Sequence, residues 1–506
     1  MNRLGRTVVA FLISNCMIGA ICFSQSLEIR DNDAGRPLLY YEGAPCFAYG
    51  PSPQNILTYL PRGNGNDVCD WATWARKYGM SHVRSYPPHF IVEGAAFNLF
   101  ESDLTQPDKF DLDRMNERYF EALRLACLLL KENGIVVHLQ MWQAVTWKKN
   151  WDRCYYNPHN NVNPELSLHA GPQEFVTMSN PTLLSHQKAY VRKILDATAD
   201  LGNVFYDIMN ELGNGTGADQ EWVKEIVNEI NAWEGEHNID VLLTLNDEGG
   251  QKLGGFTLAY DKLDLIVKDL GRYDEHSDTS RAYKKPTISV RNIDWNYQKK
   301  ERCYFWGEKN LEITSEHEYQ VRGRKYWWRM FMAGVQSAGA YADALAIRDI
   351  HTIFGLGDAG FRKIGHENNI FGWVIPVYRF NTITERYFYN FKKFVDTIRD
   401  YGSLQLRENI VIGHPATHTY ALESRDQAVI YLESPNGAAG YSYGPQQASV
   451  VFKELMDGSY DACWYFPSDG STIPFQTEVV GQKISLLFPS CNDDLVLHLK
   501  KETGDK

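Results

Sequence analysis

Short apolar segments rich in β-branched residues alternate with longer helical patterns from residue 44 to about residue 400. This alternation is the signature of parallel β-strands joined by helices. The segments that we predict to be strands are residues 46–49, 82–86, 135–141, 204–209, 241–245, 263–267, 287–290 and 338–342. The helical patterns between them are strongest at residues 68–78, 113–132, 183–200, 220–233 and 322–336. Asp111 and Asp113 are expected to cap the helix at 113–132, and Gly134 to end it.

Eight strands with interleaved helices favour a closed (β/α)8 barrel over an open sheet. An open sheet would be expected to carry a glycine-rich phosphate-binding turn after its first strand, and none follows residue 49. A glycine-rich segment does occur at residues 213–217, but it follows the fourth strand and a glutamate, so we interpret it as an active-site loop. The predicted fold class is α/β, a (β/α)8 barrel followed by a small antiparallel β-sandwich.

The chain is expected to divide into three segments. Residues 1–24 begin with Arg3 and Arg6, continue with an apolar run at 8–21 and end in a plausible cleavage site, which is the pattern of a secretory signal peptide. A lipoprotein signal is less favoured, because Ile21 precedes Cys22 where a small residue would be needed. The barrel is expected over residues 25–402. Short alternating segments after it fit an antiparallel sandwich over residues 403–506, and the protein is expected to be secreted or periplasmic.

The composition argues against several classes of partner. The formal net charge of −12 disfavours nucleic acids and anionic membranes, since both select for basic patches. No segment beyond the signal pattern is apolar for long enough to cross a bilayer. The cysteine spacings match no zinc motif, and we predict no metal and no cofactor. The oligomeric state is left open.

The most informative segment is residues 204–211, where an apolar strand ends in Asn210 and Glu211. In a parallel barrel, catalytic groups lie at the carboxyl ends of the strands, where the loops converge. A carboxyl group there is partly desolvated, so it can stay protonated and donate to a leaving oxygen. The alternative interpretation is that the two residues cap the next helix. The strand context favours chemistry, with Glu211 as the proton donor.

Several motifs resemble the clan A glycoside hydrolases. They are Asn210-Glu211 at the end of the fourth strand, His82-Val83-Arg84 in the second, and residues 110–114 (FDLDR) and 134–137 (GIVV) around the following helix. The resemblance implies that Glu211 is the acid/base, that Arg84 supports the nucleophile and that Asn210 holds the sugar. Residues 324–334 before Gly339-Ala340-Tyr341 are similar to the last βα turn of such barrels. Residues 464–467 (WYFP) and 492–497 (NDDLVL) are similar to the small β domain of apiosidase-like proteins, which was once named for collagen binding.

The sequence departs from the clan A pattern at the seventh strand. That strand is expected to end in a second catalytic glutamate, and Arg291 stands there instead. A retaining mechanism needs two carboxyl groups about 5 Å apart, and an inverting one roughly 6.5–9.5 Å apart. Three acids could supply the missing group, each of which could instead be a solvated loop or helix-terminal charge: Asp294 just after the strand, and Glu316 and Glu318 at the end of the long loop that follows it.

Aromatic side chains after the strands are candidates for stacking on sugar rings. Trp142 and Trp147 follow the third strand, and they could form an exposed platform or belong to the core. Trp295 and Trp373 lie in the loops after the seventh and eighth strands, and Tyr341 lies near the end of the eighth.

The sequence therefore predicts an enzyme that hydrolyses glycosidic bonds of poly- or oligosaccharides. Glu211 would protonate the leaving oxygen, and a carboxylate after strand seven would act as nucleophile or base. A barrel that binds carbohydrate without cleaving it is the main alternative, because Arg291 replaces the expected glutamate. A carbohydrate esterase or lyase is less favoured, and no Gly-x-Ser-x-Gly motif is present to anchor an esterase triad.

Overall fold

The structure is a computed structural model. It describes residues 27–32, 35–51, 57, 66–91, 98–144, 150–166, 171–212, 220–247, 253, 255–268, 279, 282–291, 303–305, 308–311, 316–335, 337–340, 382–408, 410–413, 418–433 and 442–502. The signal-peptide prediction for residues 1–24 lies outside this part of the chain. Within it, no helix is both long and apolar enough to span a membrane.

Parallel strands form two four-stranded sheets. Each of the eight predicted segments overlaps one of the eight strands in these sheets. The strands are β4 (Ala48–Pro51), β5 (His82–Ser85), β8 (Val136–Gln143), β9 (Val204–Asn210), β10 (Leu243–Thr244), β11 (Ile266–Lys268), β12 (Thr287–Arg291) and β15 (Ser337–Ala340). The strand orders are β10-β9-β8-β5 and β11-β12-β15-β4, with every neighbouring pair parallel. The α/β prediction is therefore confirmed.

Contacts join the two sheets at both edges. Next to β5, the Ser81 N–H donates to the Tyr49 carbonyl of β4 at 2.8 Å. Next to β11, the Asp264 N–H donates to the Leu243 carbonyl of β10 at 2.8 Å. Residues from strands of both sheets also bury their side chains in one apolar cluster, which consists of Ala48, Val136, Phe205, Leu265, Val267 and Ile288.

A small antiparallel sheet that the sequence analysis did not predict packs against this cluster. It consists of β1 (Glu28–Asp31), β2 (Pro37–Tyr41) and β3 (Ala44–Pro45). Ile29 and Tyr41 contact the cluster, and the Leu27 N–H donates to the carbonyl of Gly202, two residues before β9, at 2.8 Å. The small sheet therefore lies at the amino ends of the parallel strands, which leaves their carboxyl ends for the site.

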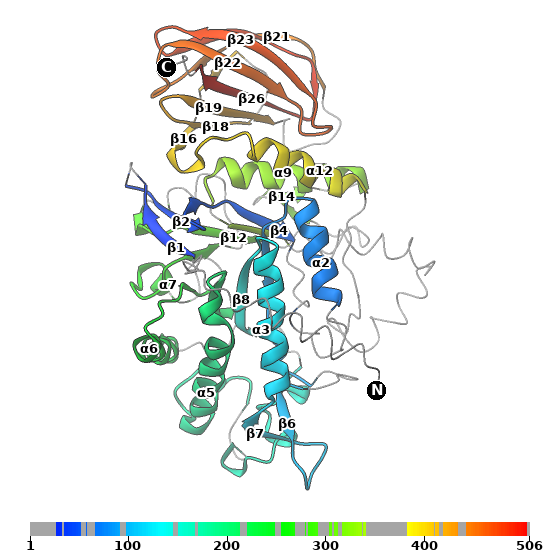
Figure 1. Cartoon of the computed structure of the whole chain (residues 1–506), viewed down its shortest axis with the longest axis vertical. Coiled ribbons are helices and arrows are strands. Elements are labelled where there is room, and N and C mark those ends of the chain that lie inside the picture. The colour runs from blue at the N-terminus through cyan, green and yellow to red at the C-terminus, as the bar shows by residue number, and fades with distance from the viewer. Residues whose placement is uncertain are drawn as a thin grey trace, which may run out of the picture.

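Helices run alongside the parallel strands (Figure 1). They are α2 (Asn66–Lys77), α3 (Glu117–Glu132), α5 (Pro181–Thr198), α6 (Gln220–His237), α7 (Phe256–Ala259), α9 (Glu316–Met332) and α12 (Thr382–Val395). Single 3-10 turns occur at Trp151–Arg153, Pro158–Asn160, Pro164–Leu166, Ala199–Leu201 and Tyr401–Ser403. A β-hairpin of β13 (Cys303–Phe305) and β14 (Glu308–Leu311) lies between β12 and α9.

The predicted start of α3 is wrong. Residues 113–115 do not begin the helix, because they belong to β7 (Phe110–Met115), which pairs with β6 (Phe100–Ser102) in a hairpin. The N-cap is Asn116, whose side chain accepts a hydrogen bond from the Arg118 N–H at 3.2 Å. Asp111 and Asp113 therefore do not cap the helix. Its predicted end is confirmed, since Gly134 has a left-handed backbone with φ +71°.

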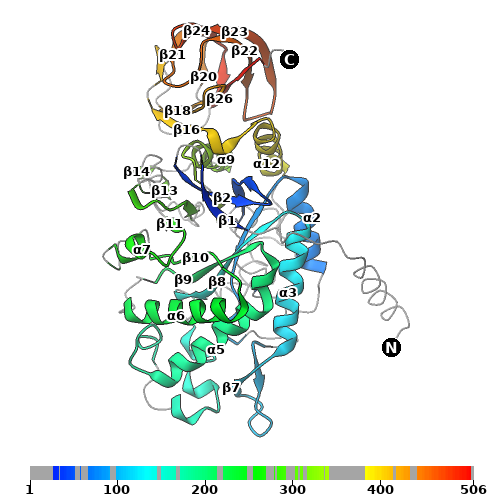
Figure 2. The same cartoon turned by 60° about the vertical axis from the view of Figure 1, so that its left-hand side comes forward.

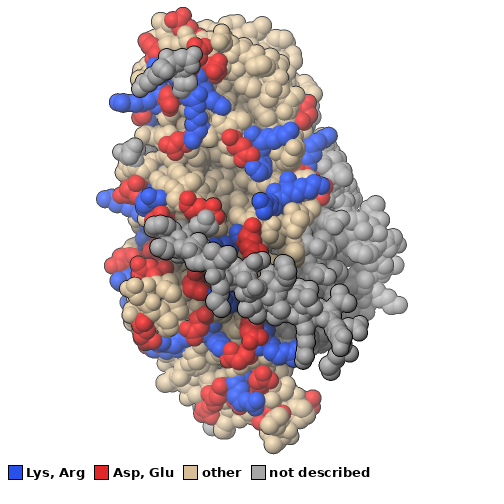
Figure 3. Space-filling model, viewed as in Figure 1, with Lys and Arg blue, Asp and Glu red and all other residues tan. Residues whose placement is uncertain are grey.

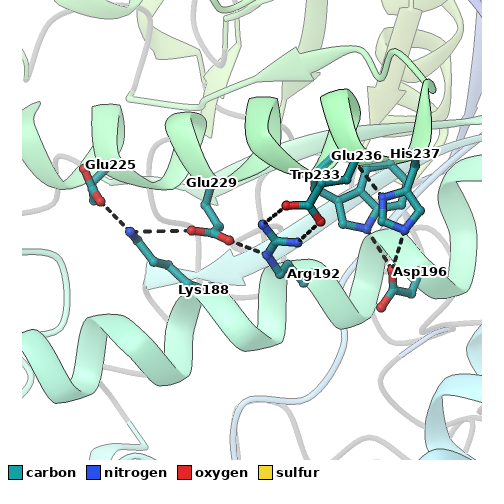
Figure 4. Close-up of polar contacts among 8 residues, drawn as sticks. All are labelled: Lys188, Arg192, Asp196, Glu225, Glu229, Trp233, Glu236 and His237. Atoms are coloured by element: carbon teal, nitrogen blue, oxygen red, sulfur yellow. Dashed lines mark hydrogen bonds and ion pairs between the residues drawn. The ribbon is translucent and has the colours of Figure 1, made fainter.

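Charged side chains join α5 to α6 along their exposed faces (Figure 4). Lys188 lies between Glu225 and Glu229, and Arg192 forms ion pairs with Glu229 and Glu236. Most of these side chains are partly buried, and ion pairs near the surface contribute about 1 kcal/mol or less each. The larger contribution to the stability of α6 comes from its apolar side, where Trp222 and Ile226 are fully buried.

Antiparallel strands make up the last hundred residues. One six-stranded sheet has the order β16 (Gln405–Glu408), β18 (His418–Glu423), β19 (Gln427–Glu433), β26 (Asp494–Lys501), β22 (Gly458–Tyr465), β23 (Thr472–Val479). A smaller sheet has the order β17 (Val411–Ile412), β21 (Gln446–Val451), β24 (Lys483–Phe488), and β20 (Ser442–Tyr443) pairs with β25 (Cys491–Asn492). Trp464 and Leu497 of the larger sheet share one buried cluster with Val450 and Phe488 of the smaller.

Helices α9 and α12 lie between the parallel strands and the antiparallel strands in both views (Figures 1 and 2). Arg324 of α9 forms a bidentate ion pair with Asp494, with N–O distances of 2.6 and 3.2 Å. Arg329 of the same helix forms a bidentate pair with Glu433. All four side chains are buried, and the ring of Trp328 between the two arginines stacks on Tyr431 at 5.5 Å. This interface fixes the antiparallel domain to the rest of the molecule.

We expect Glu433→Gln to lower the free energy of unfolding by about 3–5 kcal/mol, because it removes the carboxylate that compensates the buried charge of Arg329. The double variant Arg329→Met/Glu433→Leu should lose less, since it removes both charges and keeps apolar volume. Urea unfolding followed by tryptophan fluorescence measures both effects. The exposed Glu478→Gln change on β23 is the control, and a loss equal to that of the control would contradict a stabilising buried pair.

Candidate active site

Buried polar side chains gather where β5, β8 and β9 end. They are Arg84, Gln140, Gln143, Asp207 and Asn210, together with Asn246 just after β10. Each is 3% exposed or less. Buried polar groups persist where they satisfy one another by hydrogen bonds, so this network fixes the geometry of the strand ends.

Asn210 is held by three neighbours. Its Oδ1 accepts hydrogen bonds from Arg84 Nη2 and from Asn246 Nδ2, the latter at 2.7 Å. Its Nδ2 donates to Gln143 Oε1 at 2.7 Å. Since the guanidinium can only donate, the orientation of the Asn210 amide is determined. The second N–H of that amide has no acceptor within the described part of the chain, so it can donate to a ligand.

Asp207 is the charged group beneath Asn210. Its carboxylate contacts His138 Nε2 at 3.2 Å, Arg84 Nη2 at 3.6 Å and the Asn246 N–H at 3.2 Å. Burial by itself would raise the pKa of Asp207, but the hydrogen bond from His138 and the positive charge of Arg84 hold that pKa below its usual value. Burial also lowers the pKa of His138 to about 4. At neutral pH, Asp207 is therefore ionised, and His138 is neutral with its proton on Nε2.

Glu211 follows the last residue of β9 with a left-handed backbone of φ +55°. That conformation costs a residue other than glycine roughly 1–3 kcal/mol, and such strain is concentrated at functional sites. Neighbouring hydrogen bonds hold the chain in this turn. Asn246 N–H donates to the Met209 carbonyl at 3.2 Å, and Leu212 N–H donates to the Asn246 carbonyl at 3.0 Å. Glu211 is half-buried, at the end of the strands predicted for catalysis.

Of the two interpretations of Trp142, an exposed platform or a core residue, the structure supports the core residue. The strand β8 extends to Gln143, so Trp142 is a strand residue and lies under the helices rather than in a loop. Its side chain is 0% exposed and packs on Tyr190 of α5 and Trp222 of α6, with ring centroids 5.4 and 5.7 Å away. Trp142 therefore belongs to the core and cannot stack on a sugar.

Other predicted site residues fall outside the described part of the chain. These are Asp294, Trp147, Trp295, Tyr341 and Trp373. Glu316 and Glu318 were expected to end a loop, but they occupy the first turn of α9, which begins six residues earlier than predicted. Arg291 is the last residue of β12, so the arginine does stand at the end of the seventh parallel strand.

The sequence analysis missed Asp207, Gln140 and Gln143 as site residues. All three lie within strands that are otherwise apolar and buried. A carboxylate in the middle of the apolar run 204–209 was the signal that could have identified Asp207, because a charge in such a strand needs a buried partner. Among the described residues, no group of three His, Cys, Asp or Glu side chains is arranged to hold a metal ion.

Solved structures that resemble this one include glycoside hydrolases. One described as a glycoside hydrolase has a TM-score of 0.61 at 13% sequence identity, covering 96% of this chain and 100% of the other. A glycoside hydrolase family 5 structure from Bacteroides vulgatus ATCC 8482 has a TM-score of 0.60 at 14% identity, covering 94% of each chain. No protein-family model and no curated protein matches the sequence. The chain therefore shares the fold of glycoside hydrolases over almost its whole length.

The buried histidine predicts how stability depends on pH. Between pH 6.5 and about 4, unfolded His138 binds a proton that the native state excludes, so stability falls as the pH falls through this window. We expect His138→Gln to flatten the dependence there by about 3 kcal/mol. Urea unfolding at several pH values measures this, with the exposed His159→Gln as control. Equal slopes for both variants would contradict a neutral, buried His138.

Proposed function

We propose that this protein is a secreted glycoside hydrolase that cleaves poly- or oligosaccharides with Glu211 as the general acid. The observation that carries the proposal is the strained Glu211 backbone directly after Asn210, at the carboxyl end of a buried parallel strand. The shared fold with glycoside hydrolases supports the same conclusion. The secretory pattern of residues 1–24 supports export.

The proposal includes a closed (β/α)8 barrel followed by a β-sandwich. Closure is supported by the hydrogen bonds Ser81–Tyr49 and Asp264–Leu243, which join the two parallel sheets at their edges, and by the apolar cluster that both sheets share. A sandwich is supported by the single buried cluster between the two antiparallel sheets. We further propose that the antiparallel domain is related to that of apiosidase-like proteins, on the motifs at 464–467 and 492–497.

In the proposed reaction, Glu211 protonates the glycosidic oxygen as the bond to the anomeric carbon breaks. A second carboxylate attacks that carbon or activates a water molecule. Asn210 offers its remaining amide N–H to a sugar hydroxyl, a contact that can strengthen in the transition state. Arg84 acts through Asn210, because it holds the amide oxygen and keeps the N–H directed away from the protein network. Asp207 balances the charge of Arg84.

A carbohydrate-binding barrel without hydrolysis is the second candidate. The observation that favours it is Arg291 at the end of β12, the position where clan A enzymes are expected to carry their second glutamate. Such a protein would bind oligosaccharides and release no new reducing ends. A carbohydrate esterase or lyase would instead release acyl groups or unsaturated products.

The direct test is Glu211→Gln, assayed for new reducing ends over a broad panel of glycans. We expect kcat to fall by about 100- to 10,000-fold, because the variant cannot donate the proton. KM should change little, since the amide keeps the size and polarity of the acid. The exposed Glu132→Gln change at the far end of α3 is the control and should leave kcat unchanged. Wild-type-like activity in Glu211→Gln would refute the assignment.

Three variants, Asp294→Asn, Glu316→Gln and Glu318→Gln, test which residue supplies the second carboxylate. We expect one of these variants to lose as much kcat as Glu211→Gln, and the other two to keep most of it. Azide added to the alanine variant at the same position should restore turnover, because the truncated side chain leaves a space that a small anion can enter. If all three variants retain wild-type kcat, the second group lies elsewhere and the proposed partner of Glu211 is wrong.

A further inference from the structure

A cavity of about 790 Å³ lies away from the ends of the parallel strands, where α12 meets the six-stranded sheet. Its floor is the face of β22, β23 and β26 that is turned away from the core of the antiparallel domain. Its wall is formed by the last turn of α12 and the residues up to Arg399. We call this space the junction cleft.

The alternation of side chains along β26 explains the floor. Leu495, Leu497 and Leu499 are buried in the core of the antiparallel domain. His498 and Lys500 therefore point to the opposite face, towards the helices. Over β19 this face is covered, because Trp328 of α9 stacks on Tyr431. Beyond the end of α12 at Val395, the face towards β23 is left uncovered and forms the cleft.

The cleft concentrates positive charge. Lys393, Arg399 and Lys500 line it, and Asp461 is the one acid among the lining residues. None of the three cations has an ion-pair partner within 4.0 Å among the residues that the structure describes, although Asp461 lies opposite Lys500 in the strand pairing. Over the face seen in Figure 3, acidic and basic side chains are mixed. Arg399 lies near enough to Lys500 to disfavour its charged form, and a bound anion would relieve that repulsion.

The pKa values of Lys500 and His498 show which side chains carry the positive charge of the cleft. Partial burial and the nearby charge of Arg399 lower the pKa of Lys500. His498 contributes no positive charge at neutral pH, because burial lowers its pKa to about 3. It forms hydrogen bonds with Thr397 and Gln427, both at 3.3 Å, and so supports the floor. The positive charge of the cleft therefore comes from the two lysines and the arginine.

The surroundings favour a sugar chain as the source of the anion. Pro474 is exposed and lines the cleft beside the cations, so that an apolar C–H surface lies next to the charge. The net charge of −12 repels densely charged polymers such as nucleic acids at long range. A glycan with one carboxylate or sulfate per sugar has a lower charge density than duplex DNA, which carries one charge per about 1.7 Å of axis, and it can pair with a local group of three cations.

We propose that the junction cleft binds acidic polysaccharides, with Lys393, Arg399 and Lys500 contacting carboxylate or sulfate groups along the chain. The choice of a glycan rests on the proposed hydrolase function. The positive charge of the cleft adds that the substrate is an acidic polysaccharide. The binding itself needs no catalysis. Binding can therefore be measured in the Glu211→Gln variant, which is expected not to hydrolyse the polymer. A loss of binding there would count against the cleft, and a loss of hydrolysis would not.

The test is affinity electrophoresis and titration calorimetry of the full chain with matched polymers. Polygalacturonate and dextran sulfate distinguish carboxylate from sulfate, and galactan and dextran are their neutral counterparts. We expect binding to at least one acidic polymer and much weaker binding to its neutral counterpart. Arg399→Gln/Lys500→Gln should weaken binding by at least about tenfold, because each lost charge-assisted hydrogen bond weakens affinity by roughly that factor.

Two controls keep the result interpretable. Lys453→Gln/Lys483→Gln makes the same charge change at exposed positions outside the cleft and should bind like the wild type. Lys500→Arg keeps the cation and should retain binding, which separates lost charge from a folding defect. Equal binding of acidic and neutral polymers, or unchanged binding in the double variant, would overturn the proposal. It would also be overturned if a single-stranded DNA bound more tightly than the acidic polymers, or if inorganic sulfate bound as tightly as they do.

Discussion

A buried carboxylate, Asp207, holds together the end of the parallel sheet that carries the candidate site. It contacts Arg84 from β5, His138 from β8 and the backbone of Asn246 after β10, so one side chain connects four segments that are distant in the sequence. An ionised carboxylate is stable in such a place only when charges and hydrogen bonds compensate it. The same arginine then orients Asn210, and the chain turns sharply at Glu211 directly after it.

The two ends of the parallel strands differ in character, and this difference positions the chemistry. The amino ends carry an apolar cluster, which includes Phe205 and Val136 and is covered by β1 and β2. The carboxyl ends carry the polar network. Since parallel strands bring all their carboxyl ends to one side, residues from several strands can act on one bound molecule. Helices α9 and α12 then connect this unit to the antiparallel domain through two buried arginine–carboxylate pairs.

The sequence predicted the parallel strands well, because buried strands are continuous apolar runs whose spacing survives small errors at the ends. It also placed Asn210 and Glu211 at a strand end. The predictions were wrong where strand pairing and packing between distant segments override the local sequence pattern. Residues 113–115 were predicted to begin a helix but belong to β7, which pairs with β6. Trp142 was placed just after the third strand but continues β8 into the core. Asp207 was overlooked because its partners, Arg84 and His138, lie more than sixty residues away.

The central claim is that Glu211 donates a proton to a glycosidic oxygen at the carboxyl ends of the parallel strands. A crystal structure of Glu211→Gln, soaked with an oligosaccharide that the wild type cleaves, measures this most directly. The account predicts the amide of residue 211 about 3 Å from the glycosidic oxygen, with Asn210 at a hydroxyl of the adjacent sugar and a carboxylate within about 10 Å across the bond. A sugar bound elsewhere, with residue 211 facing bulk water, would contradict it.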